Sequence, residues 1–575
     1  MRKPFLLSAA FVLYCASGRQ GLASPNVCEQ QVGPINKSAM AYAMYSDSKF
    51  KDAAQCAAKV VNGKVVVDPA VTNPALSCPD LFSWKLFIDA LKDQFWVNWA
   101  ADQQTWPGCA AGGPGCAPPH QPTMPLPLCA QGSDPGKCCN PTSNNNPGSK
   151  DGWNPAMYCP YFPGDHKGAA AAQLGPIGLP PTKAHVNNFA VATGLSETKL
   201  LEADPSRKIR QTMSEIVFRN KSMWSYVFQN NLYNQEGLAA VLSSANANLG
   251  GNLPYRDRDA TARLNEIDFP VQSVMIKSDW LNERAALAMG LRDEPPHIKM
   301  DIRSPVTDNN GTILEKGPHW LVAMHISSKD TPNWVWTTFE HVANPGRCDY
   351  TGCNDSFGYL SADPAIGPKQ QRNFTAPKMK CDDLPLAAWV FDTEKQYADG
   401  PITPALNALF TAAGIGQGKA SPSPSPGDPR WRNYRLKGSQ VEFTDATGQF
   451  TRLGNSVTEA GFINSSSCIT CHARASIGAQ GTIPLPNGVF INQLGEQGYA
   501  ESAHGLPNPA WFQASAQPPA YRALPADFVW GVLTALCVDP KFNPAVCSLG
   551  APAAALGAPR GTVAPPRTLR EVIQH

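Results

Sequence analysis

The chain has 575 residues, of which 16% are charged, and its formal net charge is +2. This length suits two or three domains, and the absence of a dense Lys/Arg patch argues against nucleic-acid binding. The 54 prolines and 46 glycines favour long ordered loops, which the 17 cysteines could hold together through disulfides.

The first residues predict a secretory signal peptide over residues 1–24. Met1–Lys3 is cationic, an apolar run extends from Phe5 to Ala16, and small residues precede Ser24. The run is too short to cross a bilayer, and no later segment approaches about eighteen uninterrupted apolar residues. We therefore expect a mature chain without a membrane span, exported to the periplasm or otherwise outside the cytoplasm.

The region from residue 25 to 185 is expected to combine a helical segment with a disulfide-held loop. Apolar residues recur at three- and four-residue spacing over 80–91, as they do in a packed helix. Residues 107–181 are rich in Pro, Gly, Asn and Cys and lack such a period. We interpret them as a long covering loop region stapled by disulfides.

A mixed α/β central region is expected from residue 186 to 418. The pattern of residues 204–248 is helical, whereas 271–277 predicts a strand. The runs 319–327 and 334–341 are rich in aromatic and β-branched residues, so we expect two adjacent antiparallel strands.

The last third of the chain begins with repeated Ser-Pro pairs at 419–430, which predict a linker. Residues 431–548 are expected to form a small, mainly α-helical part, in which Asp527–Leu536 predicts a helix capped near Asp527. The Pro/Ala-rich residues 549–575 predict a loose tail. The expected fold class is α+β: a helical N-terminal part, a central antiparallel β region and this small C-terminal part.

The most informative motif is Cys468-Ile469-Thr470-Cys471-His472. C-x-x-C-H is the attachment sequence of one covalently bound c-type haem. Its two thiols can each add to a haem vinyl group, and the histidine that follows can supply an imidazole to the iron. The alternatives are a redox-active C-x-x-C pair, which needs a βαβ context, and half of a zinc site, which needs a second Cys/His pair. Neither requirement is met by the neighbouring sequence.

The cysteine count agrees with export. Of the 17 cysteines, 14 remain once Cys15 in the signal peptide and the two motif cysteines are set aside. An even number in an exported chain predicts that most are paired, each disulfide stabilising the fold by about 2–4 kcal/mol. Cys138 and Cys139 are adjacent and must therefore bond to different partners. The local pairs that we expect are Cys109–Cys116 and Cys537–Cys547.

The stretch from Leu453 to Ala475, which contains the motif, resembles that of exported bacterial proteins of the cytochrome c family with a single haem. The run Trp334–His341 also resembles a stretch in those proteins, so the resemblance covers roughly the second half of the chain. It implies one covalently attached haem c, thioether bonds at Cys468 and Cys471, and His472 as the proximal iron ligand. The C-terminal part would then be cytochrome c-like. The family has no agreed reaction, so the resemblance implies none.

The sixth ligand of the iron is left open by the sequence. Small cytochromes c place an axial Met after the motif, but no Met follows His472, and the last one is Met379. His504 is a distal candidate because it is the one non-terminal histidine after the motif. His319 and His325, six residues apart, would share one face of a regular strand. The candidates in the β region are Met324, His325 and His341, and the position could also be vacant or hold water.

Two functions from different classes fit these features. A six-coordinate haem suits single-electron transfer to a periplasmic redox partner protein, which the motif and the signal peptide favour. The alternative is a haem-dependent oxidoreductase of the oxidase, peroxidase or oxygenase type, with an open axial position and a small-molecule pocket in the N-terminal part. The length of the chain favours this second function, and Glu340 and His341 would offer acid/base chemistry. A non-catalytic haem sensor is a third hypothesis, and the sequence does not decide whether the chain is an enzyme.

Overall fold

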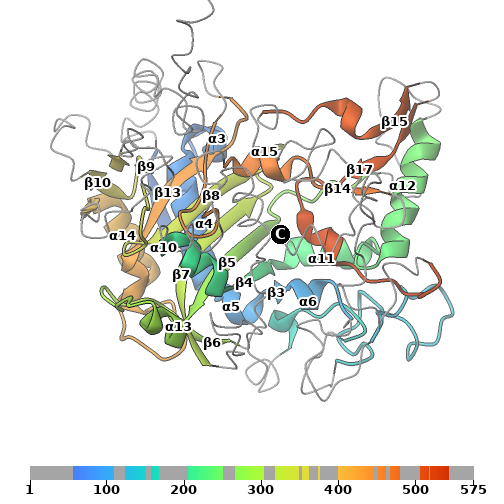
Figure 1. Cartoon of the computed structure of the whole chain (residues 1–575), viewed down its shortest axis with the longest axis horizontal. Helices are drawn as coiled ribbons and strands as arrows, with labels where there is room; N and C mark the ends of the chain where they lie inside the picture. Colours follow the sequence, from blue (N-terminus) through green and yellow to red (C-terminus); the bar gives the residue numbers. More distant parts are fainter. Residues whose placement is uncertain are drawn as a thin grey trace, which may run out of the picture.

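The described chain is a mixed α+β protein built around one antiparallel sheet (Figure 1). The computed structural model describes residues 56–108, 123–149, 157–166, 205–249, 266–302, 317–348, 353–361, 373–375, 399–444, 451–460, 466–478, 505–516 and 519–542. The expected combination of helices with a central antiparallel sheet is confirmed at this level.

Most elements of the described chain are short. The α-helices are α3 (Pro74–Ser77), α4 (Pro79–Lys92), α5 (Phe95–Asn98), α6 (Asp102–Thr105), α10 (Pro205–Thr212), α11 (Lys221–Gln229), α12 (Gln235–Leu249), α13 (Glu283–Ala288), α14 (Pro404–Ala413) and α15 (Cys468–His472). The 3-10 helices are η2 (Pro163–Asp165), η4 (Pro429–Asn433), η8 (Pro509–Trp511) and η9 (Trp530–Thr534). The strands are β1 (Ala58–Val61), β2 (Lys64–Val67), β3 (Ala100–Ala101), β4 (Met213–Arg219), β5 (Val274–Asn282), β6 (Lys299–Ile302), β7 (Gly317–Ser328), β8 (Val335–His341), β9 (Cys353–Asp355), β10 (Tyr359–Ser361), β11 (Asn373–Thr375), β12 (Asp399–Ile402), β13 (Tyr434–Gln440), β14 (Ser476–Gly478), β15 (Gln513–Ala516), β16 (Pro519–Tyr521) and β17 (Ala523–Pro525).

The central sheet has seven strands in the order β13-β8-β7-β5-β4-β3, with β6 paired to β7. The predicted antiparallel pairing of β7 with β8 is confirmed, with Ala323 opposite Glu340 and Ser328 opposite Val335. The strand expected near residues 271–277 is β5, which lies between β4 and β7. The helix expected over residues 80–91 is α4, which is also confirmed.

The prediction of helix over residues 204–248 is wrong for Met213–Arg219. Helix α10 ends at Thr212, and the next seven residues form β4, which pairs with β5 from Met213–Leu281 to Arg219–Met275. Helices α11 and α12 then follow. In a segment this short, apolar residues fit a helical and a strand period about equally well, so the pairing with β5 decides.

The central sheet has two chemically different faces. Side chains alternate between the faces along each strand. On one face Phe339 of β8 packs against Trp84 and Phe87 of α4, with ring centroids 5.0 and 4.7 Å apart; we call this the apolar face. Thr338 and Glu340, the neighbours of Phe339 in β8, point to the opposite face, which we call the polar face.

A β-bulge in β7 separates two histidines that we expected on one face. Asp279 of β5 is opposite Ala323, but Trp280 is opposite Leu321, so one residue of β7 is left over between them. The extra residue reverses the alternation of side chains. His325 therefore lies on the polar face and His319 on the apolar side, which contradicts the expectation for a regular strand.

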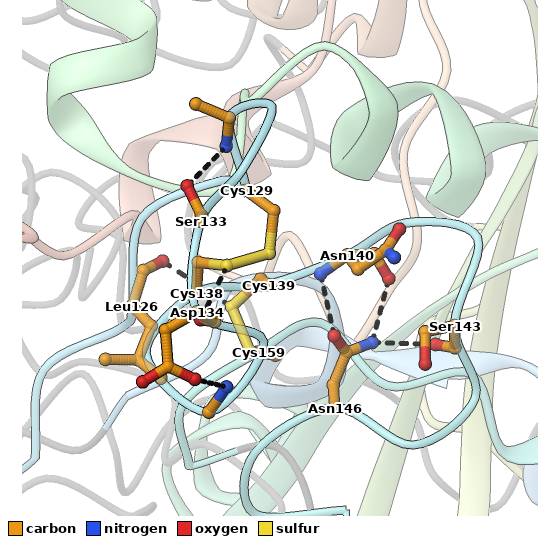
Figure 2. Close-up of a disulfide and its surroundings, with 12 residues drawn as sticks. Leu126, Cys129, Ser133, Asp134, Cys138, Cys139, Asn140, Ser143, Asn146 and Cys159 are labelled. Atoms are coloured by element: carbon orange, nitrogen blue, oxygen red, sulfur yellow. Dashed lines mark hydrogen bonds between the residues drawn. A yellow bond between two sulfur atoms is a disulfide. The ribbon is translucent and has the colours of Figure 1, made fainter.

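The covering region between the first helices and α10 is held by disulfides (Figure 2). Within residues 123–149 and 157–166 the only regular element that the structure describes is η2. Asn146 crosses the loop and donates to the carbonyl oxygens of Asn140 and Ser143 at 3.0 and 2.7 Å. The disulfides here are Cys129–Cys138 and Cys139–Cys159, so the adjacent cysteines bond to different partners as predicted.

Other cysteine predictions are met only in part. Two further disulfides join Cys56 to Cys78 and Cys348 to Cys353. Cys537 is also disulfide-bonded, to a partner outside the described residues. Its pairing with Cys547 stays a prediction, and the expected pair Cys109–Cys116 lies outside the described residues.

The C-terminal part is less helical than expected. Among the described residues of 431–548, α15 is the only α-helix, and short strands and 3-10 turns form the rest. The predicted helix Asp527–Leu536 is wrong, because it contains only the 3-10 helix η9. Asp527 and Phe528 adopt left-handed backbone conformations, with φ of 46° and 66°, which an α-helix does not accommodate.

The Ser/Pro stretch at 419–430 leads directly into the central sheet. Trp431, just after it, donates from Nε1 to the Ser425 carbonyl at 2.9 Å, and Arg430 Nε donates to Asp428 Oδ1 at 2.9 Å. Strand β13 follows and pairs with β8. Residues on both sides of this stretch therefore contribute to one sheet.

Helix α12 and strands β14 to β17 gather on one side of the molecule, at the right in Figure 1. The signal peptide predicted at 1–24, His504 and the tail 549–575 lie outside the described residues. None of the helices in the described part is both long and apolar enough to span a membrane.

Candidate functional site

Two free thiols lie in the short helix α15. Every other cysteine in the described part of the chain is disulfide-bonded, whereas Cys468 and Cys471 are free. They are three residues apart, so one turn of helix brings their side chains to neighbouring positions. Cys468 is buried, and Cys471 keeps part of its surface accessible. The expected motif thus forms a compact pair of reduced thiols.

Both thiols are in surroundings that keep them protonated. Burial raises the pKa of Cys468 well above its usual value, and the nearby Glu459 carboxylate adds to the effect. Burial also raises the pKa of Cys471. Reactive C-x-x-C pairs in redox enzymes instead have a lowered thiol pKa. This difference disfavours the redox-pair alternative.

Strand β13 anchors helix α15 to the polar face of the sheet. The backbone N–H of Ile469 donates to Gln440 Oε1 at 3.0 Å, and Gln440 Nε2 donates to Ser467 Oγ at 2.9 Å. On the other side, Trp530 Nε1 donates to the Cys471 carbonyl at 3.2 Å. The thiols are therefore held between the central sheet and the C-terminal segment. Figure 1 shows α15 in this position, between β8 and β14.

His472 is oriented by a backbone carbonyl. Its Nδ1 lies 2.8 Å from the Phe528 carbonyl oxygen and donates a proton to it. This bond leaves the lone pair on Nε2, which is the arrangement found for histidines that bind a metal. The indole ring of Trp336 packs on the imidazole with a centroid distance of 4.3 Å. Burial lowers the pKa of His472 to about 3, so the imidazole is neutral.

The carbonyl that orients His472 sits in a strained but well-supported turn. Left-handed backbone at two consecutive non-glycine residues, Asp527 and Phe528, costs of order 1 kcal/mol or more at each. The Asp527 carboxylate accepts from Lys329 Nζ at 2.5 Å and from the Phe269 N–H at 2.7 Å. These bonds hold the turn, so Asp527 positions the Phe528 carbonyl rather than capping a helix.

The polar face beneath α15 carries seven ionisable groups that are buried or partly buried. Lys277 Nζ lies 2.7 Å from Glu215 Oε2, and Lys437 Nζ lies 3.3 Å from Glu340 Oε1. Burial raises the pKa of Asp279 to about 8, against the lowering effect of Lys277. The members of this polar cluster are Glu215, Lys277, Asp279, His325, Glu340, Lys437 and Glu459. Three of its atoms are buried and have no hydrogen-bond partner in the described part of the chain: Asp279 Oδ1, His325 Nε2 and Lys437 Nζ.

The candidates for the sixth iron ligand in the β region lie on different faces of the central sheet. Met324 and His341 lie on the apolar side, where the His341 ring stacks on His297 at a centroid distance of 3.5 Å. His325 lies on the polar face, where Trp336 packs on the His472 ring. His504 lies outside the described residues. Within the described ranges, no group of three or more His, Cys, Asp or Glu residues could hold a bare metal ion.

No family model, curated protein or solved structure matches this chain. The residues that could hold a prosthetic group, Cys468, Cys471 and His472, therefore rest on the sequence motif and on its geometry. Sequence reasoning missed the residues that support them, namely Trp336, Gln440, Asp527 and Phe528. Each of these is distant from the motif in the sequence and has no pattern of its own, so only the fold connects it to the site.

Proposed function

We propose that this chain is a c-type cytochrome with one covalently bound haem, working in single-electron transfer with a redox partner protein in an oxidising compartment. Cys468 and Cys471 would form the thioether bonds, and His472 would be the proximal ligand. The bound haem would supply a one-electron Fe(III)/Fe(II) couple.

The observation that carries the proposal is the combination of a free thiol pair with a histidine presented for metal binding. Thioether formation adds each S–H across one vinyl double bond, so both cysteines must be reduced, as Cys468 and Cys471 are. His472 keeps its Nε2 lone pair because Nδ1 is bonded to the Phe528 carbonyl. The disulfides elsewhere in the described chain support an oxidising compartment, and hence export.

Part of the surface around the motif remains accessible. Cys471 and His472 are only partly buried. On the polar face, Lys277 and Glu215 keep 32% and 28% of their side-chain surface accessible. A porphyrin attached to Cys468 and Cys471 would need accessible surface of this kind.

The second candidate function is a single-haem oxidoreductase with an open axial position. The polar cluster favours it, since a carboxyl group and a neutral imidazole near a haem can move protons during oxygen or peroxide chemistry. Glu459 Oε2 lies 3.5 Å from His325 Nε2, and burial raises the pKa of Glu459 to about 7. The expected acid/base pair Glu340 and His341 cannot act together at one site, because the two side chains lie on opposite faces of the sheet.

The test is maturation of the full chain in a host that attaches haem to C-x-x-C-H sequences. The wild-type product is expected to be coloured and to keep its haem through acidic acetone, with one haem added to the mass of the mature chain. Cys471→Ser should retain at most one thioether bond, and the double variant with Cys468→Ser should retain none. The matched control is Cys129→Ser with Cys138→Ser, which removes another cysteine pair and should leave the attached haem unchanged. A colourless wild-type chain with both motif thiols free would refute the proposal.

A further inference from the structure

His325 occupies a rigid position in the middle of the central sheet. It lies in β7, with Lys277 of β5 on one side and Thr338 of β8 on the other. Strand β7 is paired with β5 and with β8 on both sides of His325, so the backbone that carries the imidazole is fixed in the sheet. The side chain of His325 is only 12% exposed.

Among the described residues, the Nε2 atom of His325 is buried and has no hydrogen-bond partner, and the same holds for Nε2 of His319 and His341. An unsatisfied buried polar atom costs about 1–3 kcal/mol and is rare in folded proteins, so each needs an explanation. Glu459 does not provide one for His325: its Oε2 is 3.5 Å away and instead accepts from the Asn455 backbone N–H at 2.5 Å. What separates His325 from the other two histidines is the side of the sheet on which it lies.

His325 and His472 lie on the same side of the sheet. Thr338 is directly opposite His325, and Trp336, two residues earlier in β8, points to the same face and packs on the His472 ring. Met324, the neighbour of His325, points to the apolar side. Of the three ligand candidates in the β region, His325 alone is on the side of His472.

We propose that His325 is the second axial ligand of the haem iron, opposite His472. This assignment rests on the proposed function and deepens it. Two imidazoles make a six-coordinate, low-spin iron that changes oxidation state with little rearrangement, which suits electron transfer over oxygen activation. It also gives the buried Nε2 atom of His325 a partner.

The test uses the full-length matured holoprotein and absorption spectroscopy. The wild type is expected to be low-spin in both oxidation states, and its reduced form should not bind carbon monoxide. His325→Ala should give high-spin ferric iron and a reduced form that binds carbon monoxide. Added imidazole should restore the low-spin spectrum of this variant, which a purely structural role of His325 would not allow.

The matched control is His319→Ala, which removes a buried histidine of the same strand on the opposite side and should leave the spectrum unchanged. If His325→Ala does not fold, His325→Met keeps the bulk and a ligand atom, and is expected to be low-spin with a higher reduction potential. A wild type that is high-spin or binds carbon monoxide, or a His325→Ala spectrum identical to wild type, would overturn the assignment while leaving the haem proposal intact. Wild-type protein without covalent haem would contradict the proposed function itself.

Discussion

The apolar and polar faces of the central sheet are built from the same strands but have opposite energetics. On the apolar face, Trp84 and Phe87 of α4 pack with Phe339 and Trp431 at centroid distances of 4.7 to 5.9 Å. Burying such rings stabilises a fold by about 2–3 kcal/mol each. On the polar face, charges and unpartnered polar atoms are desolvated, which costs stability unless they are paired.

The packed aromatic core and the candidate site therefore lie on opposite faces of one sheet. The free thiols and His472 are next to the polar face, whereas α4 covers the apolar face. A chain selected for stability alone would fill the polar face with apolar side chains. The contributions of the two faces to stability should differ in size, in reversibility and in pH dependence.

The largest effect is expected on the apolar face. Phe87→Ala should lower the free energy of unfolding by about 3–5 kcal/mol, because Phe87 is fully buried among aromatic rings. Denaturant unfolding at several pH values measures the effect, and the loss should be independent of pH. A loss below about 1 kcal/mol would show that α4 does not anchor the sheet as described.

On the polar face, the stability lost through one substitution should be restored by a second substitution. Glu340→Gln should destabilise the fold by about 3 kcal/mol, since it leaves the buried Lys437 ammonium without its counter-charge. The double variant with Lys437→Met removes both charges and should recover most of this stability. A double-mutant cycle by denaturant unfolding checks both statements, and additive losses would contradict the pairing.

At Asp279 the expected effect is smaller for each unit of pH and accumulates as the pH rises. Burial raises its folded-state pKa to about 8, so folding favours the protonated carboxyl group. The stabilising contribution is complete below pH 4 and is lost as the pH rises toward 8, by on the order of 1 kcal/mol per unit. Asp279→Asn should flatten this part of the stability profile. Parallel profiles for the two proteins between pH 5 and pH 8 would refute the prediction.

The smallest effect on stability is expected for a solvent-exposed ion pair that lies on neither face of the sheet. Lys64 Nζ and Asp93 Oδ1 are 2.5 Å apart, but the two side chains are 47% and 42% exposed. Solvent and salt screen such a pair, so Lys64→Ala should change the free energy of unfolding by less than about 0.5 kcal/mol. The midpoint of thermal unfolding, measured at low and at high salt, tests this baseline.

Local patterns predicted several elements well. The spacing of apolar residues placed α4, and the aromatic, β-branched runs placed β7 and β8 as an antiparallel pair. Local patterns failed for β4, where a short apolar segment fits two periods, and for Asp527, which resembles a helix cap but supports a left-handed turn. In both cases contacts with distant residues, with β5 and with Lys329, override the local preference.

The motif Cys468–His472 could be recognised without any structure, because the spacing of two thiols and an imidazole is a property of five consecutive residues. The sequence also showed that a cysteine-rich covering region must be cross-linked. The side of the sheet on which each histidine of β7 lies depends on the fold, since one extra residue in a bulge reverses the face of every side chain beyond it. The Phe528 carbonyl that orients His472 also depends on the fold, because a contact across 56 residues of chain leaves no periodic trace in the sequence.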